Sequence, residues 1–299
     1  MTSSPVPAEH PDPAASVPDR GSAAAPSRAD VGVIGGSGFY TFLEDVEHVR
    51  VDTPFGEPSD EVALGRVGNR PVAFLARHGR DHRFPPHRVN YRANLWALRA
   101  LGVRQVLAPC AVGSLLPEQG PGTLAVPDQV IDRTWGRPHT LYDEPGPVVH
   151  VPFADPYCPR GRAAVLATAA AQDAPAVDGA TLVVINGPRF SSRAESQWHR
   201  AAGGTLVGMT GMPEAAIARE LALCFTTVAL VTDLDAGVEA GPSVTHEEVM
   251  RVFARNVDRL KDLLRATIPA LPAAEDDDSA ACACRRVLDG ITLPFALPG

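Results

Sequence analysis

Short apolar runs rich in β-branched residues alternate with helix-like segments from Val31 onward, and this alternation constrains the fold more than any other feature. Such alternation is typical of α/β proteins, in which helices pack on a central sheet. Six runs are predicted as buried strands: Val31–Ile34, Pro71–Ala76, Val106–Ala108, Thr181–Ile185, Leu206–Val207 and Thr226–Val231. Five segments are predicted as helices: Asn90–Leu101, Arg160–Ala171, Ser192–Ala201, Pro213–Leu223 and Glu247–Thr267. In an α/β fold, ligands bind beyond the carboxyl ends of the strands, so chemistry is expected there.

The two ends of the chain differ in composition from its middle. Residues 1–29 include 18 Ala, Pro or Ser residues and lack the basic start and apolar core of a secretory signal, so we expect a disordered tail. An acidic stretch, Glu275–Asp278, follows the last predicted helix. We therefore expect one domain over residues 30–272, followed by an acidic linker and a C-terminal docking segment over residues 273–299.

Charge and residue usage exclude several functional classes. A net charge of −8 and a pI near 5.6 give no overall attraction to phosphate backbones or anionic lipid, so we expect neither nucleic acid nor membrane as a partner. Lys261 is the only lysine, which excludes a P-loop and disfavours Schiff-base chemistry.

Five cysteines are too few and too scattered for a disulfide scaffold, which favours a reducing cytoplasm. Cys110, Cys158 and Cys224 each stand alone in the sequence. The Cys282-Ala283-Cys284 motif is open to three readings: a redox pair, half a metal site, or a structural element. Without matching His or Cys ligands in the sequence, a structural or incidental role is favoured.

Two strand ends carry groups suited to an anion. Gly35–Gly38 leaves room for backbone amides and a hydroxyl to approach a phosphate, although it lacks the third glycine of a dinucleotide fingerprint. Arg77 and His78 follow the second strand and form a second potential clamp. The alternatives are a tight turn at the first position and a solvated basic turn at the second.

Two further strand ends carry polar groups. In Gly208–Glu214, small residues and a hydroxyl precede a predicted helix. This segment is either a loop that binds a ligand or an ordinary helix start. Asp233 and Asp235 lie two residues apart after an apolar strand. If the chain is extended there, both side chains point to the same side and can contact the same edge of a ligand. Their alternative role is a helix cap or an internal ion pair.

Two other catalytic classes lack their sequence signatures. The spacing of His78, His82 and His87 does not match a zinc motif, so no metal site is expected there. Ser37 lies outside any G-x-S-x-G elbow, which argues against a serine nucleophile.

Taken together, these segments make the chain similar to the trimeric nucleoside phosphorylases, most closely the S-methyl-5′-thioadenosine phosphorylases. The resemblance runs from about Val31 to Leu271 and is carried by six segments: Val33–Gly38, Asp52–Gly56, Ala76–His82, Val89–Leu98, Gly187–Ser196 and Thr232–Asp235. It implies a single-domain α/β fold with a central mixed sheet, a homotrimer, no metal or organic cofactor, and inorganic phosphate as co-substrate.

The resemblance also assigns roles to particular residues. Asp233 and Asp235 would be catalytic, the first at purine N7 and the second at the 6-amino group. The expected phosphate-binding residues are Ser37, Arg77, His78, Ala111 and Thr210. The expected substrate-binding residues are Phe190, Ser191, Met209, His246, Val249 and, from a neighbouring subunit, His150.

The chemistry explains these residue types. Cleavage of a purine–ribose bond leaves positive charge on the sugar and negative charge on the base, so an acid at N7 and an anion at C1′ both lower the barrier. An aspartate side chain that faces position 6 of the purine favours adenine, whereas an amide side chain there would favour a 6-oxopurine. The expected reaction is phosphorolysis of 5′-substituted adenosines of the 5′-methylthioadenosine type.

The 5′ substituent is the open part of this prediction. His246 replaces the apolar residue of the methylthio enzymes and resembles the residue that contacts a 5′-hydroxyl in general purine nucleoside phosphorylases. A 5′-fluoro or 5′-chloro group is therefore an alternative to methylthio, as is adenosine itself, and His246 is otherwise a surface histidine. A nucleosidase that uses water and a non-catalytic nucleoside sensor are the competing functions.

Overall fold

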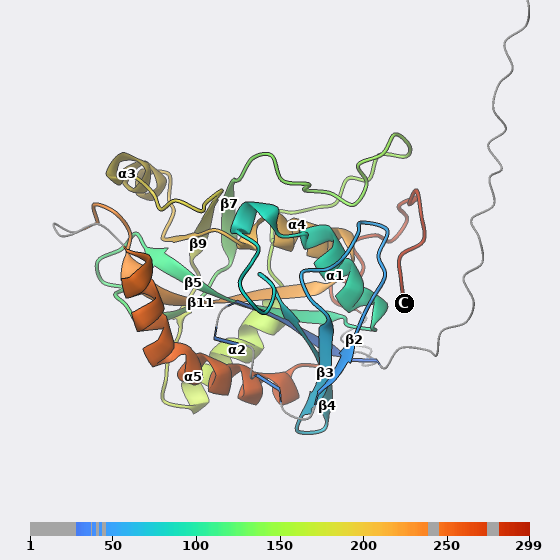
Figure 1. The fold of residues 1–299 in the computed structure, drawn as a ribbon, viewed down its shortest axis with the longest axis horizontal. Coiled ribbons are helices and arrows are strands. Elements are labelled where there is room, and N and C mark those ends of the chain that lie inside the picture. The colour runs from blue at the N-terminus through green and yellow to red at the C-terminus, as the bar shows by residue number, and fades with distance from the viewer. Residues whose placement is uncertain (1–27, 37, 40–41, 44–45, 239–244, 274–280) are drawn as a thin grey trace, which may run out of the picture.

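The computed structural model describes residues 28–36, 38–39, 42–43, 46–238, 245–273 and 281–299. Figure 1 shows a central sheet with α1 and α4 on one face and α2 and α5 on the other. The helices are η1 (Pro86–Arg88), α1 (Tyr91–Ala100), α2 (Pro159–Ala171), α3 (Arg193–Ala201), α4 (Gly211–Glu220) and α5 (His246–Ala270). The strands are β1 (Val31–Gly35), β2 (Glu47–Val49), β3 (Val62–Val67), β4 (Arg70–Ala76), β5 (Gln105–Ser114), β6 (Leu124–Val126), β7 (Gln129–Arg133), β8 (Val177–Asp178), β9 (Thr181–Ile185), β10 (Leu206–Gly208) and β11 (Cys224–Leu234).

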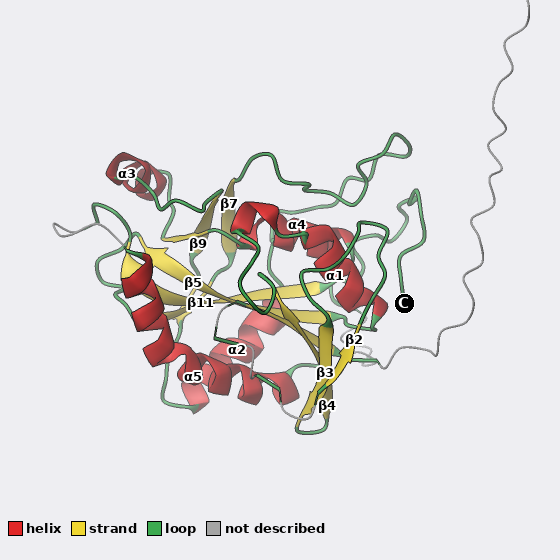
Figure 2. Cartoon of the chain, in the orientation of Figure 1, coloured by secondary structure: helices red, strands yellow, loops and turns green. Residues whose placement is uncertain are grey.

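The sheet is mixed, as the family resemblance implied. Strands β4, β1, β5 and β11 run parallel in the middle, whereas β10 pairs with β5 in the antiparallel direction. Strands β2 and β3 extend the sheet beyond β4 as antiparallel neighbours. Figure 2 shows that loops and helices surround this sheet.

Both faces of the central strands are buried. In β4, Val72 and Phe74 pack in one apolar cluster, while Ala73 and Leu75 pack in the other. Because successive side chains of a strand point to opposite faces, this division places a hydrophobic layer on each side of the sheet. Two covered faces leave the strand ends as the places where polar groups can meet a ligand.

The predicted strands and helices are all present, but several boundaries were wrong. Residues Thr181–Ile185 form β9 as predicted, whereas β5 and β11 are longer than the apolar runs that marked them. Pro109 and Gly113 break the apolar pattern of β5, yet the strand continues because β11 pairs along its length. Strands β2, β3, β6, β7 and β8 were missed, since they are short or carry polar residues.

Residues 281–299, the C-terminal segment, lie against the body of the domain. Phe295 packs on three aromatic rings, with centroid distances of 6.5 Å to Phe55, 5.8 Å to Trp96 and 5.3 Å to Tyr142. Among the residues that the structure describes, no helix is long and apolar enough to cross a membrane.

Candidate active site

A cavity of about 410 Å³ lies at the carboxyl ends of the central strands. Its walls include residues from Arg77 and His78 after β4, from Thr232 to Asp235 at the end of β11, and from the start of α5. Arg77 and Asp233 therefore face one cavity. Of the thirteen predicted site residues, eleven line it: Arg77, His78, Ala111, Phe190, Ser191, Met209, Thr210, Asp233, Asp235, His246 and Val249. Ser37 lies outside the described residues, and His150 is exposed and is not part of the cavity wall.

A gap along one edge of β5 forms the floor of this cavity. On that edge β5 pairs with β1 as far as Leu107, and then with β10 from Gly113 onward. Between these pairings, residues 108–112 have no strand partner on that side within the described part of the chain. Backbone polar groups need partners, so this stretch is suited to bind a ligand, and Ala111 lies within it.

Arg77 is held rigidly at the cavity wall. Its guanidinium is 2% exposed and donates to both carboxylate oxygens of Glu214, at 2.8 and 3.0 Å, from Nε and Nη2. It also donates to the carbonyls of Ile34 and Pro109. These four bonds engage four of the five N–H groups of a guanidinium, which leaves one N–H on Nη1, next to Gly36. The burial rules out the solvated basic turn.

His78 presents an uncharged imidazole to the cavity. Burial, and then the neighbouring Arg77 charge, lower its pKa to about 4. Nδ1 lies 2.8 Å from the carbonyl oxygen of Phe84, which fixes Nδ1 as the protonated nitrogen and leaves Nε2 as an acceptor. The ring stacks on His82, with centroids 4.5 Å apart.

Asp233 and Asp235 lie on the same side of the strand end. A Cβ atom on Gly113 would lie 2.9 Å from Asp233 Oδ1 and 3.3 Å from Asp235 Cβ, so only glycine leaves room for both side chains. Thr232 donates to Asp233 Oδ2 at 2.8 Å, and Ser196 donates to Asp235 Oδ2 at 2.6 Å. Each carboxylate therefore keeps one oxygen that is not used by these bonds.

The pKa of Asp233 is raised to about 6, first by burial and then by the charges of Asp235 and Glu248. A hydrogen bond from Thr232 opposes this rise. The charge of Asp235 contributes to this rise in pKa, but burial is the larger effect. A carboxyl group with this pKa can carry a proton near neutral pH.

The loops beside the carboxylates are fixed by Arg137. This buried arginine donates to the backbone carbonyls of Asn186, Met209 and Met212, at 2.9, 2.9 and 2.5 Å. It thus ties the Met209–Thr210 loop to the chain that leads to Phe190. Ser191 lies on that chain, and its buried hydroxyl has no hydrogen-bond partner among the described residues, which makes it available to a ligand.

The first two turns of α5 form one side of the cavity mouth. His246, Val249, Met250 and Phe253 line it at helical spacing, so one face of the helix is turned to the cavity. His246 itself is exposed. The pKa of His82, on the same cavity wall, is lowered by burial and by the charge of His246, which shows that the two imidazoles are neighbours.

The family follows from a comparison with known proteins. A family model described as the phosphorylase superfamily matches residues 30–269 of the chain. The chain belongs to the phosphorylase superfamily. The resemblance found in the sequence motifs is thereby confirmed.

Similar members of the superfamily include both purine nucleoside and methylthioadenosine enzymes. The chain is 62% identical over 278 residues to a purine nucleoside phosphorylase of Streptomyces coelicolor, covering 91% of this chain and 98% of that protein. It is 54% identical over 269 residues to an S-methyl-5′-thioadenosine phosphorylase of Mycobacterium tuberculosis, covering 90% and 97%. The structure of the Schistosoma mansoni methylthioadenosine phosphorylase with adenine matches with a TM-score of 0.80 and 38% identity, covering 84% of this chain and 94% of that one.

Four residues that hold or flank the cavity residues were not predicted as site residues from the sequence. Glu214 holds Arg77, Arg137 holds the loops, Ser196 holds Asp235, and His82 stacks on His78. Of these four residues, only Glu214 could have been predicted from the sequence, because it is an acidic residue in the first turn of a helix that follows a glycine-containing loop. The contacts of Arg137 and Ser196 join segments far apart in the chain, whereas His78 and His82 meet within one irregular loop.

Proposed function

We propose that this phosphorylase uses inorganic phosphate to cleave the N-glycosidic bond of 5′-deoxy-5′-substituted adenosines. The products are adenine and the 5-substituted ribose 1-phosphate. The observation that carries the proposal is a single cavity lined by Arg77 and His78 together with Asp233 and Asp235. Phosphorolysis requires an anion site and an acid within reach of one substrate, and the names of the relatives agree with that reaction.

The anion site is suited to phosphate because its donors are fixed before the ligand arrives. The remaining Nη1 N–H of Arg77, the unpaired edge of β5 at Ala111 and the hydroxyl of Thr210 are the donors we assign to it, together with Ser37. His78 Nε2 accepts a hydrogen bond from a protonated phosphate oxygen, because its Nδ1 already donates to the Phe84 carbonyl. Fixed donors turn the encounter of phosphate with C1′ into a positioned attack.

Asp233 supplies the proton that the departing base needs. Its Oδ2 accepts from Thr232, so a proton on Oδ1 points to the space above Gly113. Because the pKa is about 6, the carboxyl group donates to purine N7 near neutral pH without a large energetic cost. Partial transfer of this proton disperses the negative charge that develops on the base.

Asp235 selects adenine. Its Oδ2 accepts from Ser196, which leaves Oδ1 to accept from the 6-amino group of the purine. A 6-oxopurine would place an acceptor against this carboxylate, and an unpaired buried polar group is costly. Phe190 packs on the purine and sugar, while the Met209 amide and the Ser191 hydroxyl bind the ribose.

The 5′ group lies at the mouth formed by His246 and Val249. Val249, Met250 and Phe253 supply apolar surface for a methylthio group. The imidazole of His246 favours the second candidate, a purine nucleoside phosphorylase that acts on adenosine through its 5′-hydroxyl. We further propose a cytoplasmic homotrimer that uses no cofactor, in which the exposed His150 enters the mouth of a neighbouring subunit.

The decisive experiment measures adenine release with and without phosphate. We expect release from 5′-methylthioadenosine to require phosphate and to yield a sugar 1-phosphate. Equal release in phosphate-free buffer would instead show a nucleosidase and would refute the proposal. Binding without release would identify a nucleoside sensor.

A substrate series separates the two phosphorylase candidates. The values of kcat/KM are compared for 5′-methylthioadenosine, adenosine, and the 5′-fluoro and 5′-chloro analogues. We expect the substituted adenosines to exceed adenosine. A preference for adenosine that is lost in His246→Leu would favour the second candidate.

A further inference from the structure

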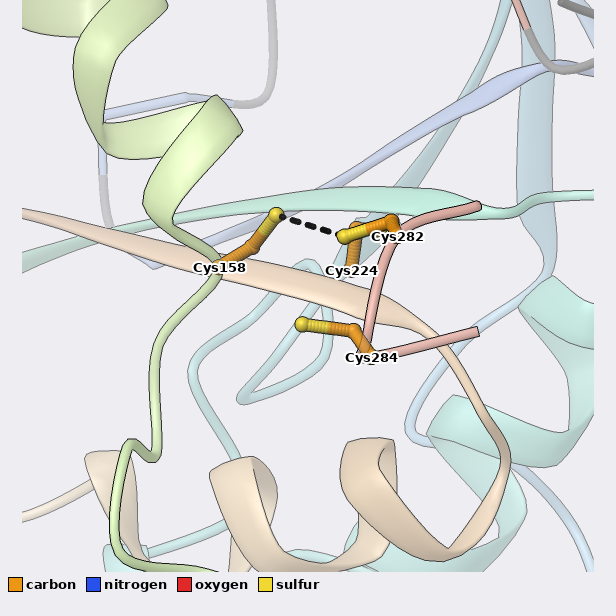
Figure 3. A group of neighbouring side chains, drawn as sticks. All are labelled: Cys158, Cys224, Cys282 and Cys284. Atoms are coloured by element: carbon orange, nitrogen blue, oxygen red, sulfur yellow. Dashed lines mark hydrogen bonds between the residues drawn. The ribbon is translucent and has the colours of Figure 1, made fainter. Parts of the chain in front are cut away.

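Four buried cysteines meet beside the amino end of β11, the opposite end from Asp233 (Figure 3). Cys158 caps the start of α2, Cys224 begins β11, and Cys282 and Cys284 belong to the C-terminal segment. Their Sγ atoms all lie within 4.8 Å of one another, and those of Cys158 and Cys282 are 3.8 Å apart. Cys158 and Cys224 stand alone in the sequence, but the fold places them beside Cys282 and Cys284 and so supplies the partners that the CxC motif lacked.

The backbone fixes this arrangement. Cys158 N–H donates to the carbonyl of Phe225 at 2.8 Å, which joins the start of α2 to the start of β11. Gly161 permits the approach, because a Cβ atom there would lie 2.1 Å from Thr226 Oγ1. A turn closes the C-terminal half, since Arg285 N–H donates to the carbonyl of Cys282 at 2.9 Å.

These thiols do not behave as ordinary core side chains. All four are at most 5% exposed, and they form a cluster of their own, to which no aliphatic or aromatic side chain of the described residues belongs. All four are free thiols. Buried cysteines that served only to fill the core would mix with the neighbouring apolar side chains instead of facing one another.

The spacing and chemistry match a tetrahedral metal site. Zinc binds thiolate sulfur at about 2.3 Å, so sulfurs at the corners of a tetrahedron lie about 3.8 Å apart. The Cys158–Cys282 separation equals this edge. Cys158 lies at the start of α2, where the helix dipole stabilises a thiolate.

We propose that Cys158, Cys224, Cys282 and Cys284 bind a structural zinc ion as a tetrathiolate. Four protein ligands leave no open position for substrate or water, which is typical of a structural rather than a catalytic zinc site. Cys224 and Asp233 lie nine residues apart on β11, or about 30 Å along an extended strand, so the ion takes no part in phosphorolysis. Its role is to fasten the C-terminal segment to α2 and β11.

The direct test is the metal content of the full-length protein, purified without an affinity tag from zinc-supplemented medium under reducing conditions. We expect about one zinc per chain, and X-ray absorption should show four sulfur neighbours at about 2.3 Å. Alkylation should spare Cys158, Cys224, Cys282 and Cys284 until the zinc is removed, after which these four cysteines should react. Zinc bound mainly through nitrogen or oxygen would overturn the proposal.

Three further results would overturn it: a zinc-free protein with two disulfides, a zinc-free protein with freely reactive thiols, or iron in place of zinc. These outcomes are independent of adenine release, so failure of this proposal is distinguishable from failure of the proposed function. The double variant Cys282→Ser/Cys284→Ser should lose the zinc, whereas Cys110→Ser should retain it. If the double variant does not fold, the metal content and sulfur coordination of the unmodified protein still decide the question.

Discussion

The two ends of β11 carry opposite kinds of polar cluster on one strand. At its carboxyl end, Asp233 faces a cavity with one carboxylate oxygen free of protein bonds. At its amino end, Cys224 faces three other thiols. Between them the strand is buried without interruption. The contrast shows that groups with unused bonding capacity mark the end that opens to the cavity, and groups that face one another mark the end covered by the C-terminal segment.

The geometry of the sheet explains why the two ends differ. At the carboxyl end, β5 leaves an unpaired edge between its pairings with β1 and β10, and this edge opens the cavity. At the amino end, β5 pairs with both β1 and β11 from Gln105, so no such gap exists along these strands. The gap that opens the cavity therefore lies at the carboxyl end of these strands, whereas the C-terminal segment packs against their amino end.

The largest effect is expected from Asp233→Asn. The asparagine retains the shape but carries no transferable proton, so kcat for phosphorolysis should fall at least 100-fold, the lower range for acid–base catalysis. Steady-state adenine release is the measurement, and Asp262→Asn on the exposed side of α5 is the control. Zinc content should be unchanged in both variants. Turnover within a few-fold of the parent would remove Asp233 from the role of acid.

Glu214→Gln tests whether the active-site end also contains a structural element. The variant leaves the buried Arg77 charge without its carboxylate, which should cost about 3 kcal/mol of unfolding free energy. Glu61→Gln is a matched control, because its pair with Arg50 has the same 2.8 Å distance but is exposed. Denaturant titration should show no measurable change in the control. An equal loss of unfolding free energy in the two variants would show that burial does not determine how much the ion pair contributes to stability.

The amount that sequence could predict differs between the two ends. Asp233, Asp235, Arg77 and His78 follow predicted strands, and the rule that ligands bind at carboxyl ends was enough to group them. Their positions directly after the strands, together with the shared direction of those strands, place them at one edge of the sheet. That part of the site could be predicted because each residue is next to its own strand.

Contacts between distant segments could not be predicted in this way. Cys158 and Cys284 are 126 positions apart in the sequence, and their meeting depends on how α2 and the C-terminal segment pack. The same holds for Ser196 and Asp235, which are joined only after α3 docks. Periodicity identifies a helix but not the residue that it presents to a neighbouring strand end.

The stability of Asp233→Asn should change in the opposite direction to its activity. The pKa of about 6 in the folded protein exceeds the unfolded value of about 3.9, so the ionised carboxylate costs stability above pH 6. Asparagine removes this cost and should raise the unfolding free energy by about 3 kcal/mol at pH 7. The gain should vanish below about pH 4, where both states are protonated. Denaturant titrations at the two pH values test this, and a gain at pH 4 alone would be inconsistent with it.

A smaller effect is expected from Ser196→Ala. In this variant Asp235 would lose the Ser196 hydroxyl that donates a hydrogen bond to its Oδ2. A hydrogen bond to a charged group is worth about 1.5–3 kcal/mol. We expect kcat/KM for the adenine substrate to fall about tenfold. Ser192→Ala is the control on the same helix, since it removes the cap of α3 without contacting Asp235. A larger loss in the control would show that helix stability, rather than the carboxylate, decides the rate.

The smallest effect on catalysis is expected from removing the proposed zinc ion. A chelator applied with mild thiol modification, followed by assay below the unfolding temperature, should change kcat by less than about twofold. The reason is the distance of about 30 Å along β11, which is rigid because both its faces are packed. The midpoint of thermal unfolding should nevertheless fall, and limited proteolysis should reach the C-terminal segment. A loss of kcat as large as that of Asp233→Asn would show that the two ends of β11 are coupled, and the division between a catalytic end and a stabilising end would no longer hold.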